Sequence, residues 1–136
     1  MTPDLWIVLS LALLTELLTL PPAFARGSVP GGIKWLFYNR DTRLEGVPSW
    51  GDRAVRAHDN LANNLAMYVG IIGIAYITGA TSGVTMIAGI VLLIARVLHA
   101  IVYIAGIPYL RTAVFAVGQF AMLVYVWEIV VHFMGR

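Results

Sequence analysis

The sequence predicts an all-α membrane protein, an antiparallel four-transmembrane-helix bundle that forms a single domain over residues 1–136. Composition is the first reason: 60% of the residues are hydrophobic and 12% are charged, whereas a soluble domain carries roughly 25% charged residues. The second is a set of four apolar runs, each near the ~20 residues that cross a ~30 Å hydrocarbon core as a helix. The third is that these runs lack the alternation of strands, and four strands could not close a barrel in lipid.

The apolar runs predict helices over about residues 4–25, 53–78, 83–107 and 111–134. The first run ends in AFAR, which is similar to a signal-peptidase cleavage site. However, the preceding MTPDLW has no lysine or arginine, and the apolar stretch is longer than the roughly 7–15 residues of a signal-peptide core. We therefore expect a helix that is retained in the membrane.

The connections between the helices predict how the chain is oriented. The loop of about 26–52 is rich in aromatic residues that suit the headgroup layer, and together with its flanks it holds six of the nine basic residues. A seventh, Arg111, follows the turn between the last two helices, whereas the turn at 79–83 has none. By the positive-inside rule we expect the long loop and the last turn in the cytoplasm and both termini in the periplasm.

Composition also limits the chemistry. The chain has no cysteine, which excludes a disulfide, a thiolate nucleophile and a cysteine-ligated metal. His58, His99 and His132 differ in depth or face and lack the spacing of a metal site, so no metal is expected. A net charge of +2 is too small to indicate nucleic acid as a partner. The expected partner is therefore the lipid bilayer.

The segment RAHDNLANN, residues 56–64, opens the second predicted helix with many polar side chains. Arg56, Asn60 and Asn63 fall at i, i+4 and i+7, which is one helix face about 10 Å long, and His58 points elsewhere. One interpretation is structural: the arginine snorkels to the interface and the amides bond between helices. The other is that the stripe binds a ligand, because polar groups inside membrane spans are costly and are commonly functional.

A second polar stripe lies in ARVLHAIVY, residues 95–103 of the third predicted helix. Arg96, His99 and Tyr103 again share one face. Arg96 lies deep enough that a lone charge costs about 2.5–3.5 kcal/mol, so it needs a partner. Glu16 has a similar depth in the first helix, and both a structural Glu16–Arg96 pair and a ligand role for Arg96 remain open.

The second and third helices run in opposite directions, so the start of one and the end of the other meet at the same membrane face. The polar residues therefore converge in the cytoplasmic half, whereas the opposite half holds almost nothing polar; Gln119 in the last helix is expected to hydrogen-bond between helices. Such a cationic, amide-lined crevice suits a small anionic ligand about 10 Å long, the length of an extended tripeptide. The converging residues are Arg56, Asn60, Asn63, Arg96, His99, Tyr103 and Arg111.

This combination resembles the MAPEG superfamily, the membrane-associated proteins in eicosanoid and glutathione metabolism. The resemblance rests on the long basic first loop, on RAHDN at the start of the second helix, and on ARVLHAIVY followed by a proline-containing turn and LRT. It covers nearly the whole chain, which is similar to bacterial members of the microsomal glutathione transferase type. It implies a homotrimer in the bacterial inner membrane that binds glutathione between subunits on the cytoplasmic side and acts in detoxification.

The resemblance also implies roles for individual residues. Arg111 matches, allowing a one-residue shift in the turn, the arginine that stabilises the glutathione thiolate, and it is the predicted catalytic residue. An opposite charge within about 4–6 Å commonly lowers a thiol pKa by about 1–3, which raises the reactive fraction at neutral pH. The predicted glutathione-binding residues are Arg26, Arg56, His58, Asn60, Asn63, Arg96, His99 and Tyr103.

One position departs from the family pattern. The family usually has a glutamate three residues after Asn60, where it meets the amino group of the ligand, and this chain has Asn63. An amide supplies no charge, and charge-assisted hydrogen bonds are roughly twice as strong as neutral ones. Two functions therefore remain: a membrane-embedded glutathione-dependent transferase or peroxidase acting on lipophilic electrophiles, and a non-catalytic membrane binding or scaffold protein with a drifted site.

Overall fold

The structure is a computed structural model that describes residues 2–135, and within that range it contains six helices and no strand. Four stretches are long and apolar enough to cross a membrane, namely α1 together with α2, and then α4, α5 and α6. The predicted fold class, an all-α membrane protein with four spanning segments, is confirmed. The helices are α1 (Pro3–Leu17), α2 (Leu20–Gly27), α3 (Gly32–Phe37), α4 (Ser49–Thr78), α5 (Gly83–Ala105) and α6 (Pro108–Met134).

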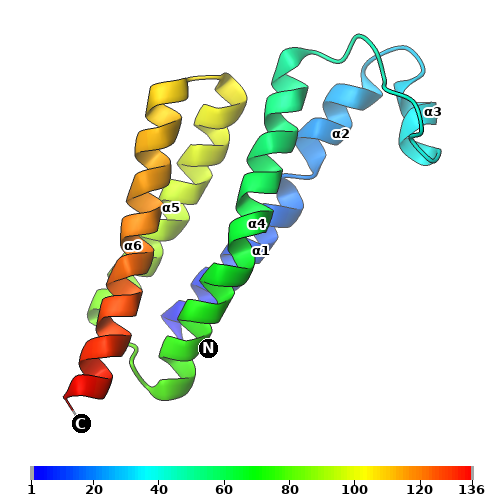
Figure 1. Cartoon of the computed structure of the whole chain (residues 1–136). Helices are drawn as coiled ribbons and strands as arrows, with labels where there is room; N and C mark the ends of the chain where they lie inside the picture. Colours follow the sequence, from blue (N-terminus) through cyan, green and yellow to red (C-terminus); the bar gives the residue numbers. More distant parts are fainter. Residues whose placement is uncertain (1, 136) are drawn as a thin grey trace.

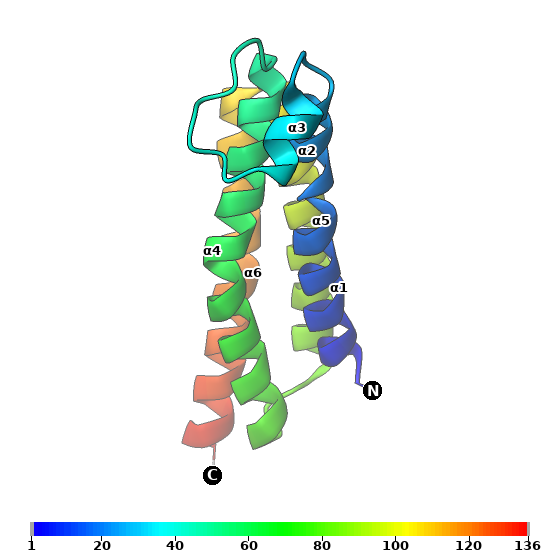
Figure 2. The same ribbon diagram turned by 90° about the vertical axis from the view of Figure 1, so that its right-hand side faces the viewer.

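Successive spans run in opposite directions, so the bundle is antiparallel (Figure 1). The α5–α6 turn lies at the same end as α2, α3 and the loop that leads into α4, whereas the start of α1, the α4–α5 turn and the end of α6 lie at the other end (Figures 1 and 2). We name the end with the α5–α6 turn the basic end, because that turn and the long loop with its flanks carry seven of the nine basic residues.

The first span is divided between α1 and α2 at Leu18 and Thr19, whereas the sequence predicts one helix over 4–25. Pro21 and Pro22 stand directly after the break, in the first turn of α2. Proline lacks an N–H, and its ring clashes with the carbonyl four residues earlier, so it is tolerated at a helix start and disfavoured in the interior. The proline pair therefore sets the position of the break.

The central element is α4, which packs against α1, α2, α5 and α6. It begins at Ser49, about one turn before the predicted start, and the loop before it contains the short helix α3. Gln119 on α6 donates to Asn64 Oδ1 on α4 at 3.3 Å, which confirms the predicted interhelical hydrogen bond. The apolar core between the spans includes Leu11, Leu61, Tyr68, Ile72, Leu92 and Tyr125, each at most 2% exposed.

The end opposite to the basic end also holds buried polar groups, so the expectation that it has almost none is wrong. Asp4 is 3% exposed, and the Tyr125 hydroxyl donates to its Oδ1 at 2.9 Å. Gly89 leaves room for this pair, because a Cβ there would lie 2.7 Å from the Tyr125 hydroxyl. Nothing in the sequence indicates that a carboxylate so near the start of the chain turns inward, which is why the pair was not predicted.

Candidate functional site

The polar residues of the basic end line a pocket between α4, α5 and α6. The pocket has two adjoining cavities, of about 240 Å³ and about 150 Å³, which share Tyr103 and Arg111. The larger cavity is lined by Asn60, His99, Tyr103, Arg111, Thr112 and Phe115. The smaller is lined by Arg53, Arg56, Tyr103, Gly106, Ile107, Pro108 and Arg111.

The α5–α6 turn brings Arg111 back over the end of α5. Gly106 ends α5 with a φ of 82°, a left-handed conformation that favours glycine, and Pro108 begins α6. Arg111 lies in the first turn of α6, and its Cζ is 4.7 Å from the centroid of the Tyr103 ring. A guanidinium stacked on a ring keeps its N–H edges free for an anion.

A second arginine is buried behind the larger cavity. Arg96 is 1% exposed, and its Nη2 donates to Asn60 Oδ1 at 2.6 Å. Its Cζ lies 5.5 Å from the centroid of the Tyr68 ring and 5.3 Å from that of Phe115. Both rings offer the cation a favourable face, while Arg96 Nε and Nη1 are buried without a hydrogen-bond partner in the described part of the chain.

A Glu16–Arg96 pair, one of the two roles left open for Arg96, is not formed among the described residues. Glu16 is exposed on the outer surface of the bundle, and no ion pair joins it to Arg96 among residues 2–135. The two residues lie at similar distances from the ends of their helices. However, Arg96 faces the interior of the bundle and donates to Asn60, so the rotation of the helices about their axes keeps Glu16 and Arg96 apart. The buried charge of Arg96 is therefore stabilised by Asn60 and by the rings of Tyr68 and Phe115 instead of by Glu16.

His99 contributes an aromatic wall to the larger cavity. The His99 side chain is buried. Its ring centroid lies 5.4 Å from the ring centroid of Tyr103, in an edge-on arrangement, and 5.6 Å from the ring centroid of Phe115. This packing holds Tyr103 from one side while Arg111 covers its face. The stripe of the third predicted helix thus lies where periodicity places it, with His99 and Tyr103 lining the cavity and Arg96 buried behind it.

Three of the predicted binding residues stand apart from this pocket. His58 lies on another face of α4, where its Nδ1 is 3.1 Å from Asp59 Oδ1. Asn63 is exposed on the outer surface of the bundle. Arg26 lines a separate cavity beside α3 and the long loop, so within one chain it does not join Arg111.

Besides Gly106, Ile107 and Pro108 of the α5–α6 turn, three residues that line the pocket were not among the predicted site residues: Arg53, Thr112 and Phe115. Arg53 donates from Nε to the carbonyl oxygen of Ile104 at 2.8 Å, which closes the C-terminal end of α5. Its spacing of i, i+3 from Arg56 is a signal that could have placed both arginines on one face. Thr112 follows Arg111 directly, but no spacing rule in the sequence distinguishes Phe115 from the other apolar residues of α6.

Four spanning helices with an arginine-lined pocket at one end define the class of this molecule: it is a small integral membrane protein with a polar pocket near one membrane face. The model of the MAPEG family matches residues 5–131, and the chain belongs to the MAPEG family. No curated protein and no solved structure matches the chain. The family match covers all the residues that line the pocket.

Proposed function

We propose that the protein is a membrane-embedded glutathione-dependent transferase that also reduces lipid hydroperoxides. The observation that carries the proposal is the position of Arg111, which stacks on Tyr103 and lines both cavities of the pocket. A fixed guanidinium beside a thiol favours the thiolate and so lowers the thiol pKa. The MAPEG assignment supports glutathione as the source of that thiol.

The remaining polar groups are suited to bind the rest of a tripeptide. Arg53 and Arg56 in the smaller cavity offer positive charge to carboxylates. Arg96 already donates to the side-chain Oδ1 of Asn60, so the Asn60 side-chain Nδ2 is left to donate to a ligand in the larger cavity. Arg96 therefore acts as a positioning residue for Asn60, and Arg111 is the residue proposed to contact the reacting sulfur.

The proposed reaction is a substitution at an electrophilic carbon. The thiol releases its proton to solvent, the thiolate attacks a lipophilic substrate that partitions from the bilayer, and a C–S bond forms. The leaving group departs as an anion with the bonding electrons, and the thioether conjugate is the product. With a hydroperoxide, two glutathione molecules are oxidised to the disulfide while the hydroperoxide is reduced to an alcohol and water.

The proposal includes a homotrimer in a bacterial inner membrane, with the basic end in the cytoplasm. The exposed amide of Asn63 supports assembly, because a polar group on the outer face of a span is costly in lipid and is commonly covered by another helix. Native mass spectrometry in mild detergent tests the trimer.

One observation favours a second function, a non-catalytic membrane binding or scaffold protein. Asn63 replaces the glutamate of the family pattern and is exposed outside both cavities. A ligand ammonium in this pocket would therefore meet no carboxylate among the lining residues of either cavity. The two functions differ in whether glutathione binds and turns over.

Binding and turnover of glutathione test the proposal directly. Purified protein in detergent should bind glutathione by calorimetry and conjugate it to a lipophilic aryl halide. Arg111→Ala should reduce conjugation by about 100-fold or more, the loss typical of removing one electrostatic stabiliser of a reacting group. Lys34→Ala, an exposed residue of α3 outside both cavities, is the matched control and should retain activity. No binding at millimolar glutathione would support the scaffold function.

A further inference from the structure

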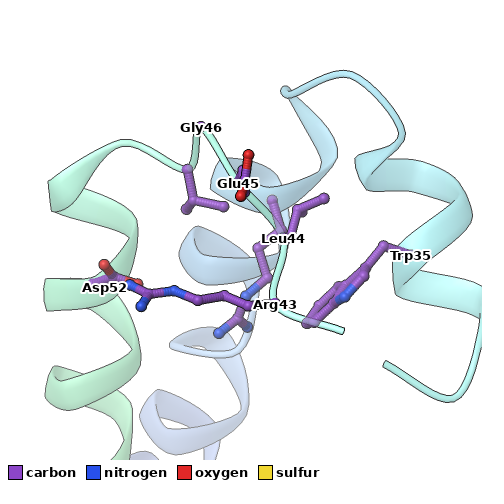
Figure 3. Close-up of a pocket in the computed structure, with 8 residues that line it drawn as sticks. Trp35, Arg43, Leu44, Glu45, Gly46 and Asp52 are labelled. Atoms are coloured by element: carbon purple, nitrogen blue, oxygen red, sulfur yellow. The ribbon is translucent and has the colours of Figure 1, made fainter. Parts of the chain in front are cut away.

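A third cavity lies at the basic end, between the long loop and the start of α4. It has a volume of about 400 Å³. Figure 3 shows Trp35 from α3 on one side, Asp52 from α4 on the other, and the loop residues between them, with Arg43 pointing across the cavity toward Asp52. We name it the loop pocket; its lining residues are Arg26, Trp35, Arg43, Leu44, Glu45, Gly46, Val47 and Asp52.

The aromatic wall of the loop pocket is fixed by several contacts. Trp35 Nε1 donates to the carbonyl oxygen of Thr42 at 2.6 Å, which ties the loop to α3. Arg26 Cζ lies 5.4 Å and Arg40 Cζ 5.5 Å from the centroid of the Trp35 ring. The indole ring is therefore already in contact with two cations, and Arg26 is held at the edge of the cavity.

The loop pocket contains both signs of charge. Arg26 and Arg43 carry guanidinium groups, and Glu45 and Asp52 carry carboxylates. None of these four forms an ion pair within 4.0 Å in the described part of the chain. Two cations and two anions that are not in direct contact can each take an opposite charge from a ligand. A zwitterion with one anionic and one cationic group matches this arrangement.

The loop pocket lies at the depth of the lipid headgroups. The first span covers Pro3–Gly27, and at 1.5 Å per residue it exceeds the ~30 Å hydrocarbon core, so Arg26 at its end reaches the headgroup layer. Large apolar side chains on the two helices that carry Arg26 and Trp35 are exposed, including Phe24 on α2 and Ile33 and Phe37 on α3, and Phe37 is 86% exposed. Such side chains on a short interfacial helix commonly insert between headgroups.

From these observations we propose that the loop pocket binds the headgroup of a phosphatidylethanolamine lipid. The phosphodiester is placed between Arg26 and Arg43, and the primary ammonium is placed at Glu45 and Asp52. The site is distinct from the cavities that hold Arg111 and requires no turnover. It would fasten the long loop, and with it the start of α4, to the membrane surface.

The chemistry of the pocket favours ethanolamine over the choline and glycerol headgroups. A choline group lacks N–H donors and is recognised by free aromatic faces, but the Trp35 ring already contacts two arginines. A glycerol headgroup carries no cation, so it would leave both carboxylates without a partner. Only a headgroup with a phosphate and a primary ammonium uses both pairs of charges.

Lipid binding to the purified full-length protein tests this proposal. Short-chain phosphatidylethanolamine, phosphatidylcholine and phosphatidylglycerol are titrated separately in detergent, and bound lipid is counted by native mass spectrometry. We expect phosphatidylethanolamine to bind at least about tenfold more tightly than either of the others, a difference of about 1.4 kcal/mol. Equal affinity for the three lipids would overturn the proposal.

Single substitutions separate the two halves of the site. Arg43→Gln should weaken phosphatidylethanolamine and phosphatidylglycerol alike by about tenfold, because both carry the phosphodiester. Asp52→Asn should weaken only phosphatidylethanolamine, so that the selectivity is lost. Lys34→Gln is the matched control, since Lys34 is an exposed cation of α3 that contacts Tyr38 and does not line the cavity, and it should retain selective binding. Unchanged selectivity in Asp52→Asn, with helix content unchanged by circular dichroism, would overturn the proposal.

A competition experiment separates the lipid from free glutathione, which also carries an ammonium and carboxylates. Millimolar glutathione should leave phosphatidylethanolamine bound to the wild-type protein. Displacement that is lost in Arg43→Gln would assign the loop pocket to glutathione and overturn the lipid assignment. This readout does not depend on conjugation, so it distinguishes failure of the lipid proposal from failure of the proposed transferase function.

Discussion

Arg96 on α5 and Asn60 on α4 are joined by a 2.6 Å hydrogen bond from Nη2 to Oδ1, at the inner wall of the pocket. This bond links a buried cation to the amide that lines the larger cavity. Because a buried charge that loses its partner is costly, the pair has consequences for stability and for ligand binding alike.

The first prediction concerns the energetic coupling of this pair. Asn60→Leu should lower the free energy of unfolding by about 1.5–3 kcal/mol, because it removes a hydrogen bond to a charged group and leaves Arg96 without its partner. The double variant Asn60→Leu/Arg96→Met should be more stable than Asn60→Leu alone, since the unpaired charge is gone as well. Denaturant titration followed by tryptophan fluorescence measures all four members of the cycle. Strict additivity of the two single effects would show that the residues are independent.

The second prediction concerns the turn that places Arg111. Gly106 has a φ of 82°, and a Cβ there would lie 3.1 Å from Arg53 Nε. Gly106→Ala should therefore cost about 1–2 kcal/mol of stability, the penalty of a left-handed residue, and should weaken ligand binding by shifting Arg111. Gly83→Ala is the control, because Gly83 has open space and no positive φ. Equal thermal midpoints for the two variants would contradict this account of the turn.

The third prediction concerns the buried carboxylate at the other end of the bundle. Tyr125→Phe removes the hydroxyl that donates to Asp4 and should destabilise the protein by about 1.5–3 kcal/mol. Adding Asp4→Asn to Tyr125→Phe should recover part of that loss, because a neutral amide is less costly to bury than a carboxylate. Tyr109→Phe, at a side chain that is 90% exposed, is the control. Thermal unfolding in detergent gives the comparison, and a Tyr125→Phe midpoint equal to that of the control would refute it.

Periodicity and hydropathy were sufficient to predict the four spanning segments, and they placed most residues of the polar stripes at one pocket, with Asn63 as the exception. Arg56 and Asn60 both line the pocket, as their spacing predicts. His99 and Tyr103 do so from α5 for the same reason. These features follow from the helix repeat and from the antiparallel order of the chain, which a sequence displays directly.

Contacts that depend on the rotation of one helix against another could not be predicted. Position along the helices alone made Glu16 a candidate partner of Arg96. In the structure the partner of Arg96 is Asn60, and Glu16 faces outward. The same limit applies to Arg26, whose place in the loop pocket depends on how the long loop folds over α2. Burial of Asp4 depends on the position of Tyr125, far away in the sequence.

The last prediction concerns the sidedness of the bundle in the membrane. The chain has no cysteine, so single-cysteine variants need no prior substitution. Tyr109 at the α5–α6 turn and Gly83 at the α4–α5 turn are both exposed and lie at opposite ends of the bundle (Figure 1). A cysteine at 109 should react with a membrane-impermeant maleimide only when the cytoplasmic side is open, and a cysteine at 83 only from the periplasmic side.

The physical basis of that sidedness is the charge of the two ends. Seven of the nine basic residues flank the long loop and the α5–α6 turn, and none lies in the α4–α5 turn, so the positive-inside rule places the basic end in the cytoplasm. A cysteine at Tyr103 should label from the same side as 109, whereas one at the buried Arg96 should label slowly or not at all. If the cysteine at 83 labels from the cytoplasm, the pocket faces outward. A cytosolic thiol would then have no access to Arg111, and the proposed transferase function would be wrong.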